Sequence, residues 1–126
     1  MSGKVVHFEI PADDVERAQT FYHETFGWQM NPMPEMSYTG LGTTPSDENG
    51  MPREPGAING GLFKRTAPFS GPVITIDVDD IDEALARVEK FGGTVVAGRE
   101  AVGEMGFTGY FKDPEGNLVG IWQTAR

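Results

Sequence analysis

The chain begins with a short stretch in which polar and apolar residues alternate. Residues 4–10 read KVVHFEI, so that Val6, Phe8 and Ile10 point to one side. His7 and Glu9 therefore share the opposite face. The alternation predicts a half-buried strand, and the proline that follows, Pro11, is expected to end it.

A helix is expected directly after this strand. Asp13 or Asp14 can cap its first turn, and Glu16 stands three residues after Asp13, as in a capping box. Apolar residues then recur every three or four positions until Gly27, a residue type that suits a left-handed helix end. The order is therefore strand, helix and glycine stop.

The second half of the chain repeats this order. At an offset of 66 residues, the matching positions are Asp13 with Asp79, Asp14 with Asp80, Val15 with Ile81, Ala18 with Ala84 and Gly27 with Gly93. Because the helix caps, the apolar helical positions and the glycine at the helix end all agree, the sequence predicts an internal duplication. We expect two βαβββ modules, residues 4–66 and 71–125, within a single domain of residues 1–126.

Each expected helix is followed by short alternating stretches. The strands predicted there are 28–33, 36–42, 57–63, 94–98, 107–112 and 118–123. DPEG at 113–116 is a turn signal and predicts a hairpin between the last two strands. Residues 43–56 have no apolar periodicity and are expected to form a long loop, either a lid or a solvated insertion.

Composition narrows the classes of partner. Nineteen acidic and ten basic residues give a net charge of −9, which repels nucleic acid and anionic lipid. The absence of cysteine excludes disulfides and thiolate metal sites. No stretch resembles a signal peptide or reaches the roughly 20 apolar residues of a membrane span. We therefore expect a cytoplasmic protein that binds neither nucleic acid nor membrane.

Three stretches of the chain together resemble the vicinal oxygen chelate superfamily, which includes glyoxalase I, extradiol dioxygenases, methylmalonyl-CoA epimerase and bleomycin resistance proteins. They are HFEIPADDVERAQTFYHETFGW, FGGTVV and GYFKDPEGNLVGIW. The resemblance implies an α+β fold in which two βαβββ modules form a curled mixed sheet around a ligand-binding cup. It also implies a homodimer. In metal-dependent members, four strand positions hold a divalent cation with His, Glu or Gln, and the metal acts as a Lewis acid.

A single one of these four positions carries a ligand in this chain. By the resemblance they fall on His7, Val73, Gly120 and a position within Asn59–Gly61, which we expect to be one of the two glycines. One imidazole does not hold a divalent metal, because catalytic sites keep about three protein ligands. We therefore expect no cofactor and no standard metal centre. The alternative is an oxygen-rich divalent metal site in which Thr75 and Asp77 join His7 and Glu9 on the cup face.

Glycine at these positions would widen the cup. The ligand-binding residues expected are His7, Glu9, Gly60, Gly61, Val73, Thr75, Leu118, Gly120 and Trp122. His7, with Glu9 nearby, is the candidate general acid or base, since an unperturbed imidazole has a pKa of about 6.5. The alternative is a buried histidine bonded to a neighbour.

Three functions are compatible with these residues. The preferred one is a glyoxalase/bleomycin-resistance-like protein that binds an apolar or cationic small molecule without the standard metal centre. The second is a metal-dependent lyase, isomerase or dioxygenase related to lactoylglutathione lyase. The third is a partner-binding module with an empty cup.

Overall fold

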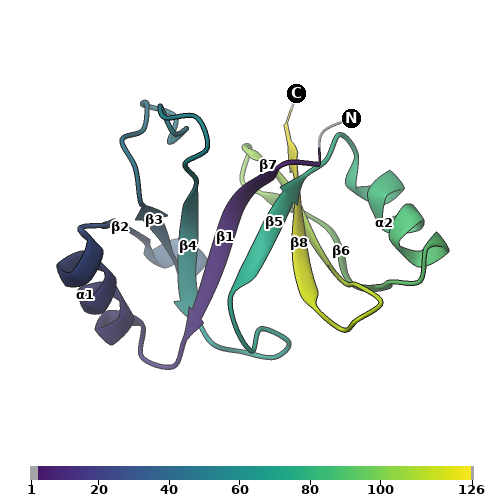
Figure 1. Ribbon diagram of the computed structural model, residues 1–126, viewed down its shortest axis with the longest axis horizontal. Helices are drawn as coiled ribbons and strands as arrows, with labels where there is room; N and C mark the ends of the chain where they lie inside the picture. Colours follow the sequence, from purple (N-terminus) through teal and green to yellow (C-terminus); the bar gives the residue numbers. More distant parts are fainter. Residues whose placement is uncertain (1–2, 126) are drawn as a thin grey trace. The chain divides into compact units, whose positions relative to one another are not determined.

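A computed structural model describes residues 3–125 of the chain, which divide into two compact units. The first unit is residues 7–72, and the second combines residues 73–125 with residues 3–6. Each contains one helix and one four-stranded group of strands (Figure 1). No helix in the described part of the chain is long and apolar enough to cross a bilayer.

The first unit follows the order βαβββ. Its elements are β1 (Val5–Ala12, residues 7–12 of which belong to this unit), α1 (Val15–Phe26), β2 (Gln29–Met33), a 3-10 turn (Pro34–Met36), β3 (Tyr38–Gly42) and β4 (Asn59–Lys64). The strands lie in the order β2-β3-β4-β1. β1 and β4 are parallel, whereas the other neighbours are antiparallel.

The second unit has the same order and the same pairing scheme. Its elements are β5 (Val73–Asp77), α2 (Ile81–Lys90), β6 (Thr94–Val102), β7 (Gly106–Lys112) and β8 (Leu118–Thr124). The strands lie in the order β5-β8-β7-β6, with β5 and β8 parallel. The expected α+β class with two βαβββ modules is confirmed. A shared cup between the two modules stays a prediction.

In each unit the helix packs on one face of the strands. The buried core of the first unit is Ala12, Leu41 and Leu62, against which Phe8, Ile10, Val15, Ala18, Trp28 and Met30 pack. The corresponding core of the second unit is Ile81, Leu85 and Ile121. Phe8 and Ile10, expected on one face of β1, therefore lie beneath α1, whereas Val6 is 37% exposed. His7 and Glu9 lie on the other face.

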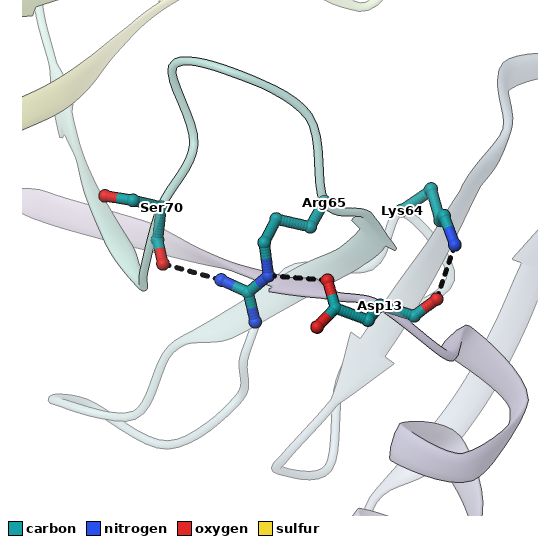
Figure 2. Close-up of polar contacts among 4 residues, drawn as sticks. All are labelled: Asp13, Lys64, Arg65 and Ser70. Carbon is teal, nitrogen blue, oxygen red and sulfur yellow. Dashed lines mark hydrogen bonds and ion pairs between the residues drawn. The ribbon is translucent and has the colours of Figure 1, made fainter.

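At the start of the chain, the predicted end of the strand at Pro11 was wrong, whereas the helix cap expected at Asp13 or Asp14 is confirmed at Asp14. Pro11 does not end β1, which continues to Ala12; the backbone bond at this end of the strand runs from the Arg65 N–H to the Ala12 carbonyl. The helix cap is Asp14, whose Oδ1 accepts from the Arg17 N–H at 3.0 Å, so no capping box starts at Asp13. Asp13 instead accepts from Arg65 Nε at 2.9 Å (Figure 2).

The helix caps of the two units should contribute equally to stability. Asp80 caps α2 as Asp14 caps α1, accepting from the Glu83 N–H at 3.0 Å. We expect Asp14→Ala and Asp80→Ala each to lower the free energy of unfolding by about 1 kcal/mol, measured by urea denaturation. Glu16→Ala is the matched control, and a comparable loss in that variant would contradict the assignment of Asp14 as the cap.

Candidate ligand-binding site

The candidate site of the first unit lies on the strand face opposite α1. β1 and β4 pair in register, with His7 opposite Asn59 and Glu9 opposite Gly61. Because side chains alternate along a strand, these four residues share one face. Tyr38 at the start of β3 reaches the same face from the far side of β4.

A chain of hydrogen bonds links three of these side chains. His7 Nε2 lies 2.8 Å from Tyr38 Oη, and Tyr38 Oη donates to Glu9 Oε2 at 2.9 Å. A phenol carries one proton, so the oxygen that donates to Glu9 accepts from His7. Neutral His7 therefore carries its proton on Nε2, and the direction of donation is His7 to Tyr38 to Glu9.

Burial has the largest effect on the charge of His7, and Glu9 beside it is buried too. Glu9 is only 7% exposed, which is low for a carboxylate. Burial lowers the pKa of His7 below 6.5, because an imidazolium loses hydration there, while the charge of Glu9 acts in the opposite direction. His7 is consequently neutral at pH 7.

Gly61 is the residue that makes room for Tyr38. A Cβ at Gly61 would lie 1.7 Å from Tyr38 Oη and 2.0 Å from Tyr38 Cζ, far inside contact distance. The phenol thus fills the space directly above this glycine. Its ring stacks on Phe63 at 6.0 Å between centroids, and Phe63 meets Phe69 edge-on at 5.1 Å.

The structure brings together some of the expected site residues and separates one. His7, Glu9 and Gly61 share the face opposite α1. Gly60 lies on the opposite face, where a Cβ would be 2.6 Å from the Phe8 ring. The sequence alone did not indicate Tyr38, because its role depends on a side chain that crosses a neighbouring strand.

The expected residues of the second unit lie on the strand face opposite α2. Thr75 pairs with Gly120 and Asp77 with Trp122, and a Cβ at Gly120 would lie 3.1 Å from Thr75 Oγ1. Alternation adds Val73, which is 2% exposed, and Leu118 to this face. Ile121 points the other way, into the core beneath α2. That these residues join His7 in one site stays a prediction.

The donor set does not fit the four-ligand metal centre implied by the resemblance. Val73 and Gly120 offer no ligand atom. On β4, the space above Gly61 contains the Tyr38 hydroxyl. Within residues 3–125, no three His, Cys, Asp or Glu side chains are grouped so that they could hold a metal ion. That the protein binds no metal, or binds one at another position, stays a prediction.

Asn59 shares the face of His7, but its side chain is engaged by the loop at 43–56. Asn59 Oδ1 accepts from the Thr43 N–H at 2.9 Å, and Nδ2 donates to Ser46 Oγ at 2.8 Å. A bridge between Ser46 and Pro52 closes the loop on itself. The expected loop is confirmed, and its role as a lid stays a prediction.

Comparison with known proteins decides the family. Residues 4–44 match a family model described as bleomycin resistance protein-like N-terminal. The chain is 33% identical over 126 aligned residues to a glyoxylase-like domain-containing protein of Didymella fabae, covering 96% of this chain and 94% of that protein. The chain belongs to the vicinal oxygen chelate superfamily. It is also 30% identical to a Mycobacterium bovis protein named as a glyoxylase, of which it spans 44%.

Solved structures of the superfamily show the same fold. A superfamily member from Vibrio splendidus 12B01 matches with a TM-score of 0.62 and 18% identity, covering 98% of this chain and 99% of that one. Streptomyces coelicolor methylmalonyl-CoA epimerase in complex with 2-nitronate-propionyl-CoA matches with a TM-score of 0.65 and 19% identity, covering 99% and 96%. At these identities the likeness establishes the fold alone.

Proposed function

We propose that this vicinal oxygen chelate protein binds a small organic cation with an aromatic or apolar part, without the four-ligand metal centre. The observation that carries this proposal is the buried carboxylate of Glu9, held by Tyr38 beside the stacked ring of Phe63. A carboxylate with little water around it favours a positive charge nearby, and the faces of aromatic rings attract the same charge.

One further observation favours a cation, and another favours a binding protein. The net charge of −9 draws positively charged molecules toward the protein from a distance. The match to the bleomycin-resistance-like family model lies on residues 4–44, which contain His7, Glu9 and Tyr38. A site of this kind sequesters its ligand, and no chemical step is required of it.

A second candidate function is acid–base catalysis, which the hydrogen-bond chain itself favours. Neutral His7 has a free Nδ1 lone pair in the tautomer that donates from Nε2, and the carboxylate of Glu9 stabilises positive charge on the imidazole through Tyr38. Such a group can accept a proton from a bound molecule. Turnover of a ligand that requires His7 would distinguish an enzyme from a binding protein.

Thermal-shift measurements test the proposal directly. We expect aromatic quaternary ammonium compounds to raise the melting temperature of the protein by several degrees at saturating concentration, while their neutral isosteres do not. Glu9→Gln should abolish this stabilisation, whereas Glu35→Gln, which changes an exposed acid outside the site, should retain it.

Two results would overturn the proposal. Equal stabilisation by cations and by their neutral isosteres would show that Glu9 does not select charge. Stoichiometric divalent metal in protein prepared without chelator, retained by wild type and lost in His7→Gln, would show a metal centre despite the donor set described above.

A further inference from the structure

The first unit has a groove where β2 passes through the 3-10 turn into β3. The groove has a volume of about 260 Å³ and lies between this connection, the end of β4 and the start of α1. We call it the β2–β3 groove. A cavity of about 150 Å³ accommodates benzene, so this groove has room for one ring and a small substituent. Its apolar lining comes from Val15, Pro32, Met33, Pro34, Leu62 and Phe63.

Lys64 is the one charged residue among those that line the β2–β3 groove. Its Nζ donates to the Asp13 carbonyl, which holds the ammonium at the end of β4 (Figure 2). An ammonium has three N–H donors, so two remain after this bond. The carboxylate of Asp13 is already paired, because its Oδ1 accepts from Arg65 Nε at 2.9 Å. The groove therefore combines an apolar lining with one positive charge that can receive an anion.

The second unit shows that no charge is needed at this position to join the strand to the helix. The register of β4 against β1 and of β8 against β5 makes Lys64 the counterpart of Gln123. Gln123 Oε1 accepts from the Ile81 N–H at 2.8 Å, at the start of α2. Because a neutral amide makes the strand-to-helix bond there, the positive charge of Lys64 is not explained by folding alone.

We propose that the β2–β3 groove binds a small carboxylate whose apolar body is about the size of one aromatic ring. The carboxylate accepts from Lys64 Nζ, and the ring lies against Met33 and Phe63. A lysine ammonium is a single point charge, which matches a monocarboxylate better than a phosphate or a dicarboxylate. The net charge of −9 does not prevent this, because salt at about 0.15 M screens exposed charges more than about 8 Å away.

The wall of the groove is largely preformed. Pro32 and Pro34 fix the backbone on either side of Met33. Ser37, which also lines the groove, has a φ of 50°, the one positive value at a non-glycine position within residues 3–125. Its N–H bonds to the Pro34 carbonyl at 3.1 Å. Such a wall loses little freedom when a ligand binds, and the flexible side chain of Met33 can adjust to the ligand.

Titration of ¹⁵N-labelled full-length protein with benzoate, followed through amide chemical shifts, tests this site. We expect saturable shifts at Met33, Ser37 and Leu62, with a dissociation constant on the order of 1 mM because so small a ligand makes few contacts. Benzamide has the same ring without the charge. It should bind about fivefold more weakly, the factor that one exposed ion pair can contribute.

Lys64→Gln tests the role of the charge. The variant installs the residue type that β8 has at Gln123 and keeps a donor for the Asp13 carbonyl, so the fold should be retained. Its affinity for benzoate should fall about fivefold. Lys112→Gln, at an exposed lysine of the second unit, is the matched control and should bind benzoate as wild type does.

The same variant separates this site from the one proposed for an organic cation. Tyr38 and Phe63 border both sites, but the charged group is Lys64 in the groove and Glu9 in the cation site. Stabilisation by quaternary ammonium compounds should therefore persist in Lys64→Gln. Either proposal can then fail while the other stands.

The carboxylate site is refuted by any of four results. They are no saturable shift at about 20 mM benzoate, well above the expected dissociation constant, equal affinity for benzoate and benzamide, and unchanged affinity in Lys64→Gln. The fourth is a set of shifts confined to residues around Arg17 and Arg65, which line a separate groove beside the first turn of α1, since the anion would then bind there.

Discussion

Gly61→Ala is expected to lower the free energy of unfolding by roughly 3 kcal/mol, a cost typical of forcing atoms into a packed site and losing buried hydrogen bonds. The new methyl group would occupy the position of the Tyr38 phenol, 1.7 Å from Oη. Tyr38 would have to leave, and its bonds to His7 and Glu9 would break. Urea denaturation followed by tryptophan fluorescence measures the loss.

Gly98→Ala is the matched control for this change. Gly98 also lies in a strand, β6, but a Cβ there meets nothing within 4 Å and its backbone angle suits any residue. Its stability should change by less than about 0.5 kcal/mol. If Gly61→Ala were equally mild and still bound ligand as wild type does, Tyr38 would not be the centre of the site.

The fold was predictable because both halves of the chain carry the same sequence signals for strand, helix cap and helix. The caps Asp14 and Asp80, and the strand alternation before them, are local signals that tertiary packing does not alter. The continuation of β1 through Pro11 was not predictable by the same route. It depends on β4 lying parallel beside that residue, where Pro11 pairs with Phe63.

The candidate site was only half predictable for a related reason. Alternation correctly placed His7 and Glu9 on one face, because face is a local property of a strand. It could not identify their partner, since Tyr38 is 31 residues from His7 and reaches it across β4. The adjacent Gly60 and Gly61 indicated that some group approaches β4 closely. Which of the two glycines lies beneath the phenol depends on the register of β4 against its neighbouring strands.

The stability of the protein should fall as the pH is lowered from 7.5 to 5.5, and His7 should account for that fall. Burial holds the pKa of folded His7 below the unfolded value of 6.5. Below pH 6.5 the unfolded chain therefore binds a proton that the folded protein resists. Above pH 6.5 neither state binds this proton, and the protein keeps its full stability. On acidification below pH 6.5 the free energy of unfolding decreases, by up to about 1.4 kcal/mol per pH unit for one proton.

Two substitutions and one control substitution test this assignment, with urea denaturation repeated at each pH. His7→Gln should flatten the dependence, whereas His23→Gln, which removes the exposed second histidine, should leave it unchanged. Glu9→Gln should steepen it, because the charge of Glu9 is what raises the pKa of His7 against the effect of burial. A slope that persists in His7→Gln, or a Glu9→Gln slope shallower than wild type, would contradict the coupling between these two groups.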